Sequence, residues 1–176
     1  MPEFTVPRRA ACAALILALG ACGTTHEFAR GPNQPSFASP KVLEQSPPLQ
    51  CVPYARGESG VLIYGDADTW WVQAGGRYPR SNIPTEGAVL VINSGKGSNR
   101  GHLAVVRRVI SAREIVVDHA NWLNRGEIDL DSPIIDVSAH NDWSQVRVWY
   151  TPDGHYGGRA YAALGFIYPF RDLAAN

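Results

Sequence analysis

The chain has 176 residues; 45% are hydrophobic, and 16 Lys and Arg balance 16 Asp and Glu. This length predicts one domain of about 100–150 residues with some chain left over. The zero net charge argues against a dedicated nucleic-acid binder, which usually carries a basic excess. The apolar content and five tryptophans argue against disorder over most of the chain. The three cysteines are an odd number and must be assigned before any catalytic argument.

The N-terminus has the pattern of a processing segment. Arg8 and Arg9 precede a short apolar run, residues 10–19, and the next small residues lead to Cys22. Such a stretch is typical of a secretory signal and is too short to span a bilayer stably. Residues 19–22 (LGAC) resemble a bacterial lipobox, which predicts a signal peptide over 1–21 and lipid attachment at Cys22. An ordinary secretory signal cleaved nearby is the alternative.

These assignments predict an exported, membrane-anchored lipoprotein that faces the periplasm or cell envelope. Gly23 follows the cysteine instead of Asp, which in the lipoproteins it resembles would not signal inner-membrane retention. Residues 22–49 are expected to form a Pro-rich, extended tether, because five prolines fall within residues 31–49 and prevent a helix.

The cysteine count then divides by role. Cys12 lies in the discarded apolar run and Cys22 would carry the lipid, which leaves Cys51 as the only thiol of the exported domain. Exported proteins usually pair their cysteines, so a single thiol suggests that its reactivity is used. A buried structural cysteine is the other interpretation.

The globular pattern starts at Gln50 and begins with two helices. Residues 51–58 predict a short helix, with Pro53 tolerated in its first turn and a glycine near its end. Residues 70–72 (WWV) predict a second helix, capped by Asp66 or Asp68 and stopped by the glycine pair at 75–76.

Strands are expected after these helices. Five runs rich in β-branched residues, 88–92, 102–110, 114–122, 145–150 and 164–168, are separated by Gly, Ser and Asn loops or by the short 111–113 connection. Short connections favour antiparallel pairing. The fold class expected is therefore α+β, in which N-terminal helices carrying the cysteine pack on an antiparallel sheet of about five or six strands.

Cys51 is placed where a helix would begin, and unpaired amides at a helix start lower the pKa of a thiol. A nucleophilic thiol also needs an imidazole within hydrogen-bond reach. His102 opens one predicted strand and His119 lies near the end of the next. If residues 111–113 form a hairpin turn, the two histidines meet at its open end. Strand alternation places His119 and Asn121 on one face, and Asp118 and Trp122 on the other.

Four segments in this order, residues 50–56 (QCVPYAR), 84–91 (PTEGAVLV), 101–106 (GHLAVV) and 119–122 (HANW), resemble a CHAP domain. This is the cysteine, histidine-dependent amidohydrolase/peptidase family, which is related to the NlpC-like wall peptidases and papain-like in fold. The resemblance covers roughly residues 48–170, which predicts a catalytic domain over 50–170 and a tail over 171–176.

The resemblance implies that Cys51 is the nucleophile and His102 the general base. Many CHAP domains have Glu-x-Asn-Trp where this chain has His119, Asn121 and Trp122. Relatives of the NlpC type use histidine to orient the base, so His119 ranks first for the third role. Asn121 ranks second, and Asp118 ranks third because alternation turns it away.

The expected activity is hydrolysis of an amide or peptide bond in peptidoglycan, by an N-acetylmuramoyl-L-alanine amidase or a stem-peptide endopeptidase. Neither a metal nor an organic cofactor is expected, since no zinc-ligand spacing is present. The expected partners are peptidoglycan and, through the lipid, a membrane; no nucleic acid is expected, and the oligomeric state stays open. The rival functions are a wall-binding lipoprotein without turnover, and a thiol acyltransferase or antibacterial toxin on the same fold.

Overall fold

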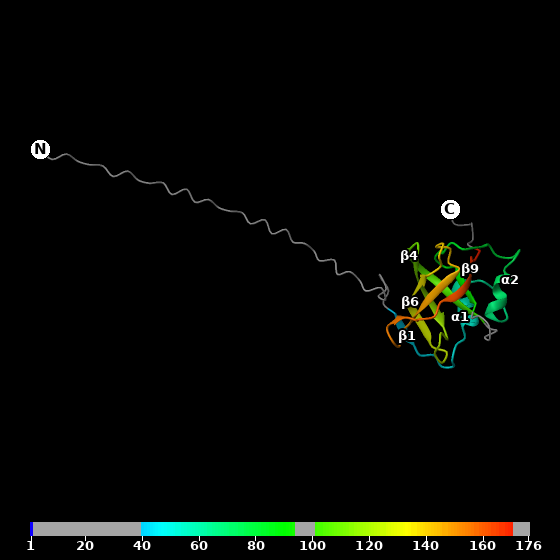
Figure 1. Ribbon diagram of the computed structural model, residues 1–176. Helices are drawn as coiled ribbons and strands as arrows, with labels where there is room; N and C mark the ends of the chain where they lie inside the picture. Colours follow the sequence, from blue (N-terminus) through cyan, green and yellow to red (C-terminus); the bar gives the residue numbers. More distant parts are fainter. Residues whose placement is uncertain (2–39, 94–100, 171–176) are drawn as a thin grey trace.

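A computed structural model describes residues 1, 40–93 and 101–170, and its main element is a closed antiparallel barrel (Figure 1). Neighbouring strands follow the order β6-β5-β4-β3-β9-β7, and β7 pairs again with β6. These strands are β3 (Val89–Asn93), β4 (His102–Ser111), β5 (Glu114–Ala120), β6 (Ile128–Asp136), β7 (Gln145–Tyr150) and β9 (Tyr161–Ile167). The sheet expected from the sequence therefore closes on itself into six strands within the described residues.

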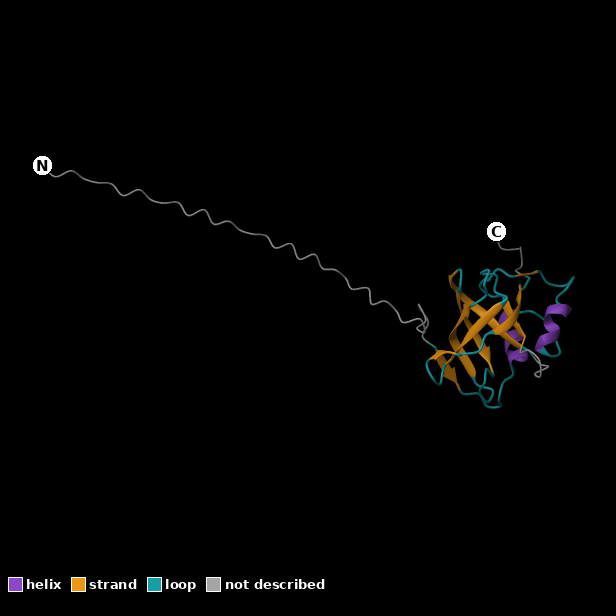
Figure 2. Ribbon diagram, viewed as in Figure 1, coloured by secondary structure: helices purple, strands orange, loops and turns teal. Residues whose placement is uncertain are grey.

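Three short strands and three helical segments complete the described chain. The strands β1 (Lys41–Leu43), β2 (Arg80–Ser81) and β8 (His155–Tyr156) pair with β6, β9 and β7 respectively. The helical segments are α1 (Cys51–Ser59), the 3₁₀ turn η1 (Ala67–Thr69) and α2 (Trp70–Gln73). Figure 2 shows the helices gathered on one side of the strands.

Two apolar clusters explain why β3 and β4 are apolar on both faces. Leu90 and Ala104 belong to one cluster, together with buried side chains of β5, β6, β7 and β9. Val91 and Leu103, one residue along, belong to the other, which includes Ala55 of α1 and Trp70 of α2. Since alternate residues of a strand point to opposite faces, β3 and β4 separate the barrel interior from the helical layer.

The first predicted helix is present, and Gly60 ends it in a left-handed conformation (φ 74°). The second helix is only one turn long and is preceded by η1. The prediction that the side chain of Asp66 or Asp68 caps it is wrong. Asp66 occupies the N-cap position of η1 but makes no capping hydrogen bond with its side chain. Instead the hydroxyl of Thr69 donates to the carbonyl oxygen of Asp66.

Two features differ from the sequence-based expectation. The strand β6 is an additional element, and its pairing with β7 closes the barrel. Residues 41–43, placed in the tether on sequence grounds, pair with β6 instead of extending away from the domain. The predicted signal peptide, the Cys22 lipid site and the 171–176 tail lie outside the described residues. No helix among the described residues is long and apolar enough to cross a membrane.

Candidate active site

The two histidines meet at the open end of the β4–β5 hairpin, as the sequence predicts. Ser111 pairs with Glu114 at the turn, and antiparallel pairing continues towards the ends that carry the histidines. His102 Nε2 lies 2.9 Å from His119 Nδ1, which is a hydrogen bond between the rings. Both side chains are buried; His102 is 5% exposed and His119 is fully enclosed. The ring of His102 is therefore held by its Nε2 side, which leaves Nδ1 as its other reactive nitrogen.

Cys51 shares a cavity with His102. The cavity has a volume of about 330 Å³, and it is lined by Gln50, Cys51, Val52, Gly65, Asp66, Ala67, Gly101, His102 and Asn121. Cys51 is the first residue of α1, is partly buried, and makes no disulfide. The nucleophile and base expected from the sequence thus face one solvent-accessible space, together with polar side chains from two other segments.

Gly101 fixes the entry of the chain into this cavity. Its φ of 62° lies in the left-handed region, and a Cβ there would approach the backbone nitrogen of Asp68 to 2.7 Å. Only glycine combines this backbone angle with so close an approach. The start of β4, and with it His102, is therefore packed directly against the η1 segment.

Burial sets the protonation of the thiol and the imidazoles. It raises the pKa of Cys51 above its ordinary value, although hydrogen bonds from the backbone amides of Leu103, Val52 and Cys51 itself lower it. Burial lowers the pKa of His102 to about 3. Burial and the adjacent His102 hold the pKa of His119 well below its usual range. The resting state is therefore a neutral thiol beside a neutral imidazole.

The expected net lowering of the Cys51 pKa by the helix start is wrong. The backbone amides act in the expected direction, but desolvation of the partly buried sulfur is the larger effect. Nucleophilic attack by this thiol would therefore need a proton acceptor during the reaction, and the neutral imidazole of His102 lines the same cavity.

Asn121 reaches the cavity but does not contact an imidazole. Its Nδ2 donates a 2.7 Å hydrogen bond to Oε1 of Gln50, the residue before the cysteine. Its φ of 61° takes it out of the regular strand, which ends at Ala120. In this structure His119, and not Asn121, is hydrogen bonded to His102.

The alternation argument holds for Asp118 and fails for Trp122. Asp118 does not line the cavity. Its carboxylate accepts hydrogen bonds from Arg107 Nε and from the backbone amide of Asp131 instead. Trp122 was expected on the face opposite His119, but their rings stack with centroids 5.9 Å apart. The left-handed conformation of Asn121 breaks the alternation and turns Trp122 back over the histidines.

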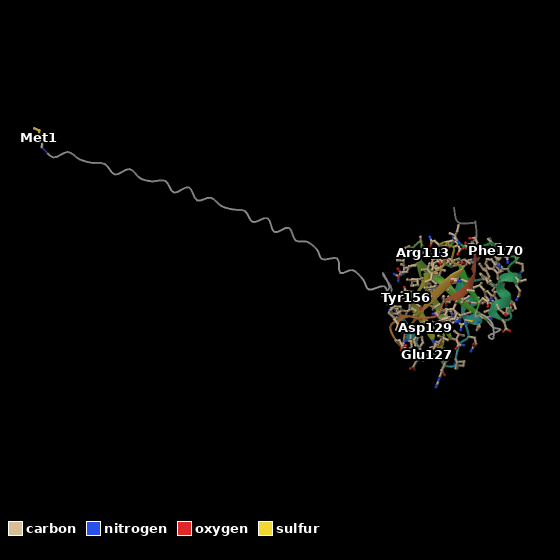
Figure 3. The ribbon with its side chains drawn as sticks, viewed as in Figure 1. Met1, Arg113, Glu127, Asp129, Tyr156 and Phe170 are labelled. Atoms are coloured by element: carbon tan, nitrogen blue, oxygen red, sulfur yellow. The ribbon has the colours of Figure 1, made fainter. Side chains whose placement is uncertain are left out.

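Sequence reasoning missed Asp129. This residue of β6 lies opposite His119 in the β5–β6 register, and its Oδ2 is 4.0 Å from His119 Nε2. Figure 3 places Asp129 near Glu127, at the end of the barrel away from Arg113. No sequence motif marks Asp129. Only a prediction of β6 and of its pairing with β5 would have placed it opposite His119.

Among the described residues, no group of three or more His, Cys, Asp and Glu side chains is placed to hold a metal ion. The chemistry available at the site is that of a thiol, two coupled imidazoles and amide donors. A cysteine at a helix start, near a buried histidine pair on a barrel wall, is an arrangement that can support nucleophilic thiol chemistry.

The CHAP domain family model matches residues 43–121, the segment that carries Cys51, His102, His119 and Asn121. Residues 43–121 are therefore identified as a CHAP domain. Membership of this family indicates amidase- or peptidase-type hydrolysis of cell wall. A search of curated proteins found no match to this chain.

Proposed function

We propose that this protein is an exported lipoprotein that cleaves an amide or peptide bond of peptidoglycan with Cys51 as nucleophile. The observation that carries the proposal is the cavity shared by Cys51 and His102, with Nε2 of His102 hydrogen bonded to His119. A nucleophile, a base and an orienting group in this order are the minimal set for covalent acyl transfer.

The proposed reaction has two halves. The sulfur of Cys51 attacks the carbonyl carbon while its proton passes to His102; the C–N bond then breaks and the leaving amine takes that proton. Water, deprotonated by His102, hydrolyses the thioester and restores the thiol. The helical arrangement supports a papain-like relation, because α1 begins with Cys51 and its Ala55 belongs to the same buried cluster as Leu103 of the barrel wall.

Two donors are available for the oxyanion. The amide of Cys51 is at the first position of a helix, where it has no partner within the helix. The Gln50 side chain lines the same cavity, and its Oε1 is occupied by Asn121, which leaves Nε2 as the group able to donate. Asn121 then acts by holding Gln50, a role different from orienting the imidazole.

The test is digestion of purified peptidoglycan by the parent protein, Cys51→Ala and His102→Ala, followed by mass spectrometry of the soluble products. His140→Ala, which removes an exposed histidine in a loop, is the matched control and should retain parental turnover. A new N-terminal alanine identifies the amidase; a new terminus inside the stem peptide identifies the endopeptidase. A Cys51→Ala variant that degrades wall as fast as the parent would overturn the mechanism.

The lipid anchor needs a separate test. Metabolic labelling with a fatty acid should mark the parent chain and leave Cys22→Ser unlabelled, and only the parent should sediment with membranes. Cys51→Ala is the matched control, since it removes a different cysteine. Equal labelling of parent and Cys22→Ser would contradict the lipoprotein proposal and leave the hydrolase proposal standing.

A further inference from the structure

The second nitrogen of His119 faces a carboxylate. Nε2 of His119 is buried and has no hydrogen-bond partner among the described residues. The nearest acidic oxygen is Oδ2 of Asp129, 4.0 Å away, on the strand paired with β5. A buried polar atom without a partner costs free energy, so such an atom in an active site calls for an explanation.

Asp129 is itself buried, 4% exposed, and is held in place by two neutral donors. Asn124 Nδ2 donates to its Oδ2 at 2.9 Å, and Thr151 Oγ1 donates to its Oδ1 at 3.1 Å. Burial raises the pKa of Asp129 to about 6, with a smaller contribution from Glu127, while the two hydrogen bonds lower it. At neutral pH the carboxylate is therefore mostly ionised.

The site of the proton on His102 determines the site of the proton on His119, and therefore what faces Asp129. If His102 accepts the thiol proton on Nδ1, its resting proton is on Nε2, the atom that contacts His119. His119 Nδ1 must then be an acceptor, so the proton of neutral His119 is on Nε2 and points towards Asp129. When His102 becomes positively charged during the reaction, Asp129 is the carboxylate on the far side of the histidine pair.

We propose that Asp129 is a positioning residue, which fixes the Nε2-protonated tautomer of His119 and balances the charge that develops on His102. This inference rests on the proposed function in one respect: His102 must act as the base for Cys51. Asp129 does not touch the cavity, since it is absent from the residues that line it.

The variant Asp129→Asn separates charge from structure. Asn124 Oδ1 accepts from the backbone amides of Gly126 and Glu127, so the Asn124 amide is fixed with Nδ2 towards position 129. An asparagine there can direct its oxygen to Asn124 and its nitrogen to the Thr151 hydroxyl, which can also accept. Both hydrogen bonds survive, and only the negative charge is lost.

Asp131→Asn is the matched control. Asp131 is also on β6 and has a left-handed backbone, which asparagine tolerates, but its carboxylate pairs with Arg108 at the surface. We expect Asp129→Asn to lower kcat on peptidoglycan about 10- to 100-fold, as removal of partners that orient a histidine does elsewhere. Asp131→Asn should stay within about twofold of the parent, as surface pairs contribute little.

The pH profile distinguishes this role from a structural one. The groups facing Asp129 are His119 on β5, Asn124 and Glu127 in the preceding loop, and Thr151 after β7; Val42 lies opposite on β1. Activity of the parent should fall as pH drops through about 6, when Asp129 takes up a proton. Asp129→Asn should lack this acidic limb, because its side chain does not titrate.

Nuclear magnetic resonance of ¹⁵N-labelled histidines tests the inference without any wall substrate. The parent should show His119 protonated on Nε2, and its ring shifts should change near pH 6 in the parent but not in Asp129→Asn. His119 protonated on Nδ1, or an acidic limb unchanged in the variant, would overturn the role of Asp129. A parent that leaves peptidoglycan intact while its His119 shifts follow this pattern would instead overturn the proposed substrate.

Thr151→Val gives a second route if Asp129→Asn does not fold. This change removes one hydrogen bond that lowers the pKa of Asp129 and keeps the volume similar. The acidic limb should then move to higher pH. A limb at the parental position in a folded Thr151→Val protein would contradict the assignment of that limb to Asp129.

Discussion

Asn121 donates its side-chain hydrogen bond to Gln50 and not to either imidazole, although it lines the same cavity as Cys51 and His102. The orienting contact to His102 comes from His119. The structure thus gives different partners to two side chains that the sequence ranked as alternatives for one position. His119 contacts the proposed base, and Asn121 holds the side-chain amide of Gln50 next to the proposed nucleophile.

This separation predicts different kinetic effects for the two residues. His119→Ala should lower kcat about 100-fold or more, because His102 loses the group that sets its tautomer. Asn121→Ala should lower kcat about tenfold, because Gln50 becomes less well ordered as a donor. Steady-state kinetics on peptidoglycan, with folding checked by circular dichroism, measures both. Full activity in His119→Ala with none in Asn121→Ala would reverse the assignment.

The raised pKa of the Cys51 thiol predicts slow alkylation at neutral pH. The rate of iodoacetamide modification should rise as pH increases through 9, because only the thiolate reacts and burial disfavours it. Peptide mapping by mass spectrometry separates Cys51 from Cys12 and Cys22. His102→Ala should show nearly the same profile, because the imidazole is neutral over this range. A plateau of reactivity between pH 5 and 8 would instead indicate a preformed ion pair.

Replacing either of two glycines that have left-handed backbones with alanine should lower stability, and by different amounts. Gly76→Ala should cost about 1–2 kcal/mol from backbone strain alone, since nothing lies within 4 Å of a Cβ there. Gly101→Ala adds a clash with the Asp68 backbone and should cost about 2–4 kcal/mol. Denaturant unfolding of both variants measures the difference. Equal losses would mean that the contact between Gly101 and η1 is readily relieved.

Burial of an ionised Asp129 predicts that charge removal stabilises the protein at high pH. Its pKa is about 6 when folded and near the ordinary 3.8 when unfolded, so folding takes up a proton between these values. The free energy of unfolding therefore falls as pH rises through this window. The Tm of Asp129→Asn relative to the parent should be roughly 2–5 °C higher at pH 8 than at pH 4. A difference that does not change with pH would contradict the shifted pKa.

The part of the site predicted from sequence is the part encoded locally. The β4–β5 hairpin follows from β-branched runs joined by a short turn, and it brings His102 and His119 together without any further information. Cys51 at the start of a helix follows from the position of Pro53 and the glycines beyond. These elements need only nearest neighbours in the chain to be recognised.

The missed parts depend on tertiary contacts. β6 contains Asp129, Asp131, Ser132 and Pro133, residues that are disfavoured in strands, so no alternating apolar pattern marks it. Pairing with β5 on one side and β7 on the other overrides those preferences. The prediction for Trp122 is wrong because Asn121 has a left-handed backbone, which interrupts the alternation of side chains along the strand before Trp122.

The pairing of β1 with β6 also has a mechanical consequence. Three residue pairs join the strands, and Val42 lies opposite Asp129. In a chain tethered at Cys22, tension between membrane and wall would enter the folded domain through β1. The load would reach β6, the strand behind His119, before it reached α1 and the nucleophile. If the proposed anchor at Cys22 is present, a force on it would therefore act first on the Asp129 side of the histidine pair and only then on the proposed base, His102.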